Sequence, residues 1–236
     1  MSDELKGRTA LITGASRGIG RAVALAMAAA GAHVILVART EGGLRDVDDE
    51  ITALGARATL VPLDLRDFAG IDRLGGAVFE RWGKLDILVG NAGLLGNLSP
   101  LGHISPEDWQ TIMDINLTAN WRLIRAFDVL LRQSDAGRAI FVTSAAAHLC
   151  TAYWGGYAIS KAALDAMVKT YAAELASTNA RANLLSPGPV RTGLRAKAYP
   201  GEDAAKLPSP EELAPLFVKM AGADFTRNGE IIRFER

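Results

Sequence analysis

Cysteine is almost absent from this chain, since Cys150 is the only one among 236 residues. An intrachain disulfide and a cysteine-based metal site are therefore excluded. The three histidines, His33, His103 and His148, are far apart and lack the spacing of metal ligands. We therefore expect a protein without a metal.

The chain also lacks an excess of charge of either sign and lacks a long apolar run. It has 26 basic and 26 acidic side chains, whereas nucleic-acid binders usually carry a basic excess. No apolar run approaches the ~18 residues of a membrane span. Residues 1–7 are polar and do not resemble a signal peptide. We expect a cytoplasmic protein that binds neither nucleic acid nor membrane.

Hydrophobic residues make up 49% of the chain, and short apolar runs alternate with longer amphipathic runs. The apolar runs predict strands, here given as Thr9–Thr13, His33–Ala38, Thr59–Leu63, Leu85–Val89, Ala139–Thr143, Ala182–Leu185 and Glu230–Phe234. The amphipathic runs predict helices, here given as Gly18–Ala30, Glu41–Leu54, Phe68–Trp82, Pro106–Arg132, Tyr157–Ser177 and Pro210–Ala221. Continuous apolar strands alternating with helices indicate one α/β domain, residues 1–236, with a doubly wound parallel sheet. The longest unpatterned stretch, 192–209, is interpreted as a functional loop.

A glycine-rich turn links the first strand to the first helix. It reads Gly14-Ala15-Ser16-Arg17-Gly18-Ile19-Gly20. Such a turn brings the unpaired N–H groups of a helix N-terminus to a phosphate, and glycine lets the phosphate approach closely. The spacing differs from the usual G-x-G-x-x-G. An ordinary strand-turn-helix corner is the alternative.

Arginine replaces the acidic residue that usually binds the adenosine ribose. That position, ~20 residues beyond the glycines, holds Arg39-Thr40, and Arg17 lies inside the glycine loop. Two guanidinium groups suit a 2′-phosphate. We therefore expect NADP(H) rather than NAD(H). The alternative is that either arginine is simply a solvated surface charge.

Two further segments follow predicted strands and complete the nucleotide half. Asp64-Leu65 follows the third strand, and its carboxylate can accept from an adenine amino group. Its alternative role is a helix N-cap, which Asp67 can also fill. Asn91-Ala92-Gly93 follows the fourth strand. Its small residues allow close approach of a ribose, and its Asn side chain can tie strands together.

Four polar residues form the candidate catalytic set. Tyr157 and Lys161 share a helix face, and the ammonium is expected to lower the pKa of the phenol toward neutrality. Ser144 ends the fifth strand, where its hydroxyl can donate to a substrate carbonyl. Asn116 lies inside a helical run, where Asn predicts a functional bend. Its alternative is an exposed surface residue.

The segment after the sixth strand contains Pro187-Gly188-Pro189-Val190-Arg191-Thr192. Its stiff turn can wall the nicotinamide end of a cofactor, and Thr192 can reach a phosphate or amide. The expected mouth of the cleft is apolar and aromatic, with Leu94, Leu95, Leu149, Tyr153, Trp154 and Leu194. These residues favour a ketone or alcohol with an apolar or ring portion. The aromatic ones also fit an interface.

Taken in order and spacing, these motifs resemble the short-chain dehydrogenase/reductase family from about Gly7 to about Thr192, and the tail looks like bacterial 3-oxoacyl-carrier-protein-reductase-like members. The resemblance implies a Rossmann-type, seven-stranded sheet with helices on both faces. It implies Tyr157 as general acid/base, Lys161 as the residue that lowers its pKa and binds the nicotinamide ribose, and Ser144 as the group that orients the carbonyl. Asn116 would hold a water in a relay to Lys161. Many members have Asn where this chain has Gly90.

The resulting functional prediction is an NADP(H)-dependent oxidoreductase that transfers a hydride between nicotinamide and a carbonyl or secondary alcohol. The alternatives are an NAD-dependent alcohol dehydrogenase and a non-catalytic NADP(H)-binding scaffold or regulator. By resemblance, helices 106–132 and 157–177 pair across a two-fold axis. A homodimer or homotetramer is therefore expected.

Overall fold

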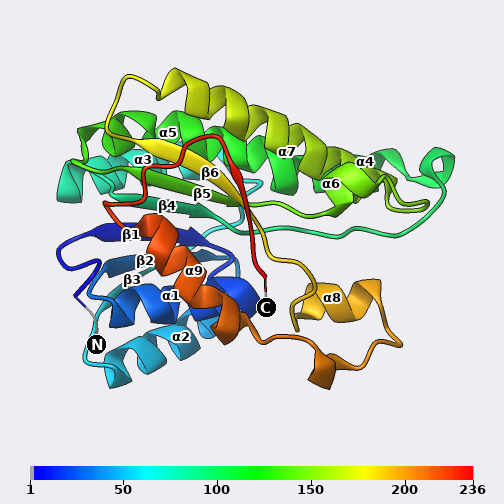
Figure 1. The fold of residues 1–236 in the computed structure, drawn as a ribbon, viewed down its shortest axis with the longest axis horizontal. Coiled ribbons are helices and arrows are strands. Elements are labelled where there is room, and N and C mark those ends of the chain that lie inside the picture. Colours follow the sequence, from blue (N-terminus) through cyan, green and yellow to red (C-terminus); the bar gives the residue numbers. More distant parts are fainter. Residues whose placement is uncertain (1–2, 236) are drawn as a thin grey trace.

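The computed structural model describes residues 3–235, which fold around one seven-stranded sheet (Figure 1). The strands are all parallel and follow the order β3-β2-β1-β4-β5-β6-β7. Their bounds are β1 (Thr9–Thr13), β2 (His33–Ala38), β3 (Ala58–Pro62), β4 (Ile87–Gly90), β5 (Arg138–Val142), β6 (Arg181–Ser186) and β7 (Ile231–Arg233). The chain order reverses between β1 and β4, and such a point opens a crevice at the carboxyl ends of the strands.

Helices cover both faces of the sheet, as Figure 1 shows. One layer contains α1 (Gly18–Ala29), α2 (Glu41–Ala53) and α9 (Pro210–Ala221). The other contains α3 (Phe68–Trp82), α4 (Pro106–Met113), α5 (Ala119–Gln133) and α7 (Gly155–Glu174). Along β1, Ala10 and Ile12 enter the first core and Leu11 enters the second. Both faces of each strand are thus apolar, which explains the continuous apolar runs and confirms the predicted fold class.

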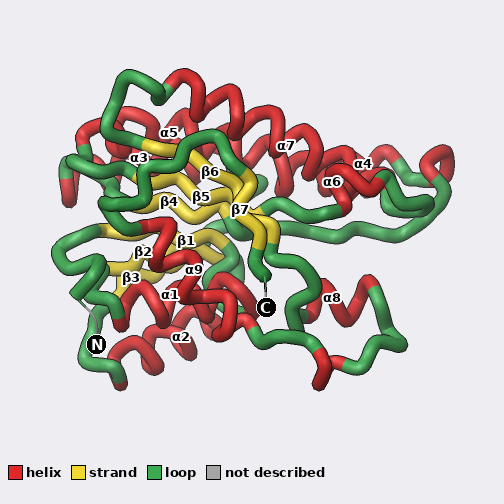
Figure 2. Tube along the Cα trace, viewed as in Figure 1, coloured by secondary structure: helices red, strands yellow, loops and turns green. Residues whose placement is uncertain are grey.

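The predicted strands and helices are found within a few residues of their expected ends. The helix expected over 106–132 is interrupted by a π-helical turn, η2 (Asp114–Thr118), between α4 and α5. The stretch 192–209 contains α8 (Gly193–Ala198) and a short 3-10 turn, η3 (Ala204–Lys206), within otherwise irregular chain (Figure 2). The structure also contains two short elements that were not predicted, η1 (Leu101–His103) and α6 (Ala146–Leu149).

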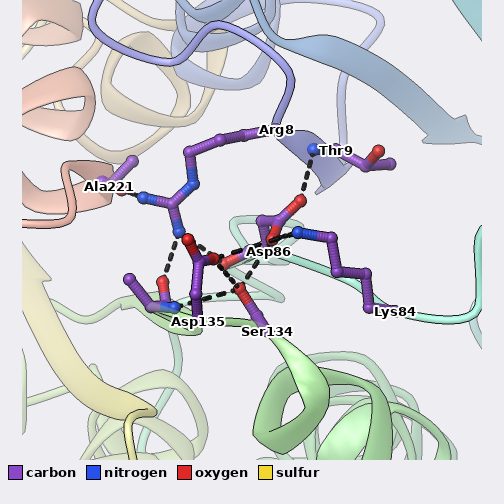
Figure 3. A network of polar contacts seen from close by, with 8 residues as sticks. Arg8, Thr9, Lys84, Asp86, Ser134, Asp135 and Ala221 are labelled. Atoms are coloured by element: carbon purple, nitrogen blue, oxygen red, sulfur yellow. Dashed lines mark hydrogen bonds and ion pairs between the residues drawn. The ribbon is translucent and has the colours of Figure 1, made fainter.

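A polar network closes the amino ends of the central strands (Figure 3). The carboxylate of Asp86 is fully buried and accepts from the backbone N–H of Thr9 at 2.9 Å. The hydroxyl of Ser134 and the ammonium of Lys84 donate to its other oxygen at 2.6 and 2.9 Å. The guanidinium of Arg8 donates to the carbonyl of Ala221 at the end of α9, at 2.9 Å. The network therefore joins β1, α5 and α9 at the edge opposite the functional cleft.

Candidate active site

A cleft of about 1340 Å³ lies at the carboxyl ends of the strands. All predicted cofactor contacts except Gly20 line it, and so do Ser144, Tyr157 and Lys161. Asn116 lies behind the wall and is fully buried. Chain reversal at β1 and β4 thus gathers residues that are far apart in the sequence.

The glycine loop has the backbone conformation that requires glycine. Gly14 and Gly18 have φ of +66° and +56°, which L side chains rarely adopt. A Cβ on Gly20 would lie 2.2 Å from the carbonyl oxygen of Gly14, so Gly20 permits close packing of helix and strand. Gly20 does not line the cleft, and its role as a cofactor contact stays a prediction. The N-cap residue of α1 is Arg17, and its side chain makes no hydrogen bond to the first turn of the helix. The backbone N–H groups of that turn suit an anion.

Arg17 and Arg39 are exposed, and no hydrogen bond or ion pair is recorded for either guanidinium with the described residues. Both line the cleft, together with Thr40. A guanidinium group without a protein partner keeps its donors available for a phosphate. The positions fit the expected 2′-phosphate site.

The carboxylate of Asp64 is already held by its neighbour. The guanidinium of Arg66 donates to it at 2.7 Å, and the backbone N–H of Arg66 donates at 3.0 Å. The hydrogen bond from the Arg66 side chain is the largest cause that lowers the pKa of Asp64. Asp67, not Asp64, is the N-cap of α3, since it accepts from the N–H of Gly70 at 2.9 Å. A role of Asp64 toward adenine stays a prediction.

Asn91 ties the ends of two strands together, as expected. Its amide donates to the carbonyl of Thr13 at 2.9 Å. The hydroxyl of Thr13 accepts from the N–H groups of Asn91 and Ala92 at 3.0 and 3.1 Å. The role of Thr13 was not predicted, because in the sequence this residue is only the end of an apolar strand. The preceding Gly90 leaves room for the ring of Phe141, which would lie 2.4 Å from a Cβ at this position.

Tyr157 and Lys161 face the cleft from the first turns of α7. The ammonium of Lys161 donates to the carbonyl of Val142 at 2.8 Å and lies 5.8 Å from the ring centre of Tyr157. Burial lowers the pKa of Lys161 to about 8. Burial also raises the pKa of Tyr157, and hydrogen bonding with Ser144 opposes that shift. The net direction of the Tyr157 pKa is opposite to our expectation, because removal from water outweighs the hydrogen bond with Ser144.

Asn116 lies in the π-helical turn and is not an exposed surface residue. Its side-chain oxygen accepts from the N–H of Leu94 at 2.8 Å. Its amide donates to the carbonyl of Leu94 and to the hydroxyl of Ser160, both at 2.9 Å. The side chain therefore anchors the loop after β4 to α7, and a π-helical turn lies where a local bend was expected. Ser160, which also donates to the carbonyl of Tyr157 at 2.7 Å, was missed.

Aromatic side chains wall the end of the cleft beyond Tyr157. The ring centre of Trp154 lies 6.0 Å from that of Tyr157 and 5.6 Å from that of Tyr199. Of the expected mouth residues, Leu94, Leu149, Trp154 and Leu194 line the cleft. Leu95 is buried and Tyr153 is exposed outside it, so the prediction was wrong for these two. Tyr199 was missed because the unpatterned stretch gave it no context.

The loop after β6 crosses the cleft toward the glycine loop. Pro187, Gly188 and Val190 line the cleft. Thr192 is the N-cap of α8, where its hydroxyl accepts from the N–H of Arg195 at 3.2 Å. A Cβ on Gly18 would lie 3.7 Å from the methyl group of Thr192. The hydroxyl that we expected to reach a cofactor is therefore engaged by α8.

Residues 3–235 contain neither a cluster of metal ligands nor a membrane-spanning helix. No cluster of His, Cys, Asp and Glu there could hold a metal ion. Likewise, no described helix is both long and apolar enough to cross a membrane.

Comparison with known proteins gives consistent matches. The family model for short chain dehydrogenases matches residues 8–203. The oxidoreductase YciK of Escherichia coli is 38% identical over 228 residues, which cover 95% of this chain and 90% of YciK. A 3-oxoacyl-[acyl-carrier-protein] reductase of Synechocystis is 35% identical over 191 residues, or 80% of this chain and 77% of that protein. A Shigella flexneri structure assigned to the short chain dehydrogenases and complexed with NADP is 36% identical, with a TM-score of 0.94 and 99% of each chain covered.

Proposed function

The chain belongs to the short chain dehydrogenases, and from this premise we propose that it is an NADP(H)-dependent enzyme that interconverts a carbonyl group and a secondary alcohol. The oxidoreductase relatives extend over nearly the whole chain, which makes it an oxidoreductase acting on CH–OH or C=O groups. The observation that carries the finer proposal is the set of Ser144, Tyr157 and Lys161 along one cleft that is also lined by two exposed arginines, Arg17 and Arg39.

The residues of the cleft fit a nicotinamide dinucleotide phosphate. The glycine loop and the first turn of α1 offer N–H groups to the pyrophosphate. Arg17 and Arg39 would bind the 2′-phosphate, and the end of β2, Val37-Ala38-Arg39-Thr40, contains no carboxylate to favour a free ribose hydroxyl. The neighbour from Shigella flexneri was solved with NADP. We therefore propose NADP(H) rather than NAD(H).

When bound, NADPH would supply the hydride for the carbonyl carbon. In the reductive direction, Tyr157 would give its phenolic proton to the carbonyl oxygen, so that an alcohol and NADP⁺ result, and one proton from solvent would restore the phenol. The hydroxyl of Ser144 would donate a hydrogen bond to the same oxygen and hold it near the phenol. Lys161 would stabilise the phenolate that proton transfer leaves on Tyr157. Oxidation of the alcohol reverses each step.

Asn116 acts in this scheme through its position in the π-helical turn. Its side chain is committed to Leu94 and Ser160, so it fixes the start of α7 and the loop after β4. A Cβ on Gly93 would lie 3.6 Å from both the Asn116 side-chain oxygen and the Lys161 ammonium. The proximity supports the proposed relay that links Asn116, a water molecule and Lys161.

A ketone or alcohol with an apolar or ring portion is the proposed substrate. Leu149, Trp154 and Leu194 line the end of the cleft that would receive it. A homodimer or homotetramer in the cytoplasm completes the proposal. The exposed Trp121 and Val129 on α5 support association through that helix.

A screen of the purified protein tests this function. NADPH absorbance is followed with a panel of ketones, ring ketones and 3-oxoacyl thioesters, and NADP⁺ reduction with the matching alcohols. Tyr157→Phe is expected to lower turnover about 10²–10⁴-fold, because general acid catalysis contributes that much. NADPH binding should remain. Tyr153→Phe is the matched control, since Tyr153 lies outside the cleft and should keep full activity.

Two results would overturn the proposal. Tight NADPH binding without turnover of any compound would favour a scaffold or regulator. Equal turnover with NADH would favour the NAD-dependent alcohol dehydrogenase. Retained turnover in Tyr157→Phe would reject the role of the phenol while leaving the reaction class intact.

A further inference from the structure

A buried carboxylate lies on the same face of α7 as the proposed catalytic pair. Asp165 follows Lys161 by one helical turn and Tyr157 by two, so all three share one face. Its side chain is only 4% exposed. Buried carboxylates are rare unless they are paired, so this position requires an explanation.

Two groups from outside α7 hold this carboxylate in place. The hydroxyl of Thr143, the residue before Ser144, donates to one oxygen of Asp165. The ring nitrogen Nε2 of His148, from α6, lies 3.0 Å from the other oxygen. That second oxygen nevertheless receives no well-aligned hydrogen bond from any described residue. The carboxylate is thus anchored but not fully neutralised.

We propose that Asp165 is a positioning residue that keeps Lys161 in its charged form beneath Tyr157. The inference rests on the proposed function, because it assigns a task within the same site. Lys161 is 2% exposed, and its one recorded hydrogen bond is to the neutral carbonyl of Val142. A buried ammonium with only a neutral partner tends to lose its proton. A fixed negative charge one turn away opposes that loss.

The electrostatics agree with the geometry. Burial lowers the pKa of Lys161, and the carboxylate of Asp165 is the one charge that acts in the opposite direction. His148 is the only ionisable group of α6. The other elements that pack against α7 carry ionisable groups that have other partners or are exposed. Arg181 of β6 donates to the carbonyls of Thr178 and Ala180, and Asp114 of η2 accepts from Gln110. On α4, Asp108 accepts from Asn97 and Glu107 is exposed.

The alternative is a purely structural tie, in which Asp165 only fastens α7 to the end of β5 through Thr143. The two roles separate experimentally. Thr143→Val removes the tie and keeps the carboxylate, whereas Asp165→Asn keeps an acceptor for Thr143 and removes the charge. Glu174→Gln is the control for loss of charge, because Glu174 lies at the far end of the same helix.

The first measurement is the titration of Lys161, observed by NMR of protein labelled with ¹³C at lysine Cε and assigned with Lys161→Met. Asp165→Asn is expected to move its midpoint down by about one pH unit, as loss of a nearby opposite charge does. Thr143→Val, Asp165→Glu and Glu174→Gln should leave it close to that of the unmodified protein. An unchanged midpoint in folded Asp165→Asn would overturn the proposal. If Asp165→Asn does not fold, Asp165→Ser carries the same expectation.

The second measurement is the pH profile of kcat for carbonyl reduction. The first proton lost at high pH belongs to the coupled Tyr157 and Lys161 pair. Removal of a negative charge makes that loss easier, so the alkaline limb moves to lower pH in Asp165→Asn. If the alkaline limb moves by about one pH unit from the pKa of Lys161, which is about 8, kcat falls about 5-fold at pH 8 and little at pH 6. A uniform loss at every pH would favour the structural tie. If no substrate turns over, the proposed function fails, yet the lysine titration still tests Asp165.

Discussion

Charged side chains at the amino ends of the strands are paired differently from those at the carboxyl ends. At the amino ends, both oxygens of Asp86 have close donors, and Lys84 is the ammonium that pairs with it. At the carboxyl ends, the guanidinium groups of Arg17 and Arg39 make no hydrogen bond or ion pair with residues 3–235, and Lys161 donates only to a carbonyl. The first arrangement joins elements of the fold, and the second leaves donors for a ligand.

This difference follows from what each edge gains by satisfying its charges. A buried charge without partners costs several kcal/mol, and the Asp86 carboxylate accordingly has a donor at each of its oxygens. Exposed arginines at a cleft cost little without partners and gain strong hydrogen bonds when a phosphate arrives. Mutations at the amino edge should therefore change stability, and mutations at the carboxyl edge should change binding and rate.

The largest expected effect is at the amino edge. Asp86→Ala leaves the N–H of Thr9 and the hydroxyl of Ser134 without their acceptor and should lower the free energy of unfolding by about 3–5 kcal/mol. Denaturant unfolding measures it, and NADPH affinity per folded molecule should not change. Asp135→Asn is the control, since Asp135 is exposed and lies 3.9 Å from Lys84. A loss of NADPH affinity in folded Asp86→Ala would contradict the separation of the two edges.

At the carboxyl edge, Arg39→Asp should change affinity and not stability. It removes charge-assisted hydrogen bonds worth about 1.5–3 kcal/mol, so the Kd for NADPH should rise about 10–100-fold. The Kd for NADH should not rise, because NADH lacks the 2′-phosphate. Calorimetric titration with both cofactors measures this. Arg45→Gln, on an exposed face of α2, is the control. Equal weakening of NADH would show that Arg39 does not bind the 2′-phosphate.

The same contrast explains what could be predicted from the sequence. Strands buried on both faces leave continuous apolar runs, so β1 and β2 were located without error and the fold class followed. Residues of the cleft stand at strand ends, where the motif order locates them even though each is weak alone. The irregular turn at Asn116 could also be located from the sequence, because an Asn inside a helical run lies in the π-helical turn.

Contacts between distant segments could not be predicted in this way. The pKa direction of Tyr157 depends on how fully the loops bury it, and sequence spacing alone does not reveal burial. Asp64 is engaged by Arg66, which depends on a local turn that we did not recognise. Helix α8 was missed because its six residues are too short for a periodic pattern.

The pH dependence of stability should distinguish the two edges next. Burial raises the pKa of Asp86, but hydrogen bonds from Ser134, Lys84 and Thr9 outweigh it, so the folded pKa lies below 3.8. Its stabilisation is therefore present above that value and is lost as the pH falls through the folded pKa. The folded pKa of Lys161 is about 8 against 10.5 unfolded. The unfolded chain binds more protons between these values, so stability rises with pH there.

Unfolding measured across the pH range checks both signs. The rise from Lys161 cannot exceed about 1.4 kcal/mol per pH unit, since it involves one proton. Lys161→Met should abolish the alkaline rise and leave the acid limb unchanged. Asp86→Asn should abolish the loss of stability at acid pH and leave the alkaline rise unchanged. If each variant altered both limbs, the two edges would be electrostatically coupled and the comparison would fail.

The smallest expected effect concerns an ion pair that lies at the carboxyl edge yet resembles those of the amino edge. Glu202 accepts two hydrogen bonds of 2.6 Å from the guanidinium of Arg195. That guanidinium lies 3.8 Å from the ring centre of Tyr199, which in turn contacts Trp154. The pair is partly exposed and spans α8 and the chain after it. The ion pair therefore holds Tyr199 in the aromatic wall of the cleft and does not support the hydrophobic core.

Glu202→Gln should change the free energy of unfolding by less than about 1 kcal/mol, because partly exposed pairs contribute little. The KM should rise by at most about 5-fold, which corresponds to the same energy, while kcat stays unchanged, since no reacting group is touched. Asp203→Asn, at the next exposed position, is the control. A stability loss as large as that of Asp86→Ala would mean that bonding geometry, and not the edge of the sheet, decides what a charge does in this protein.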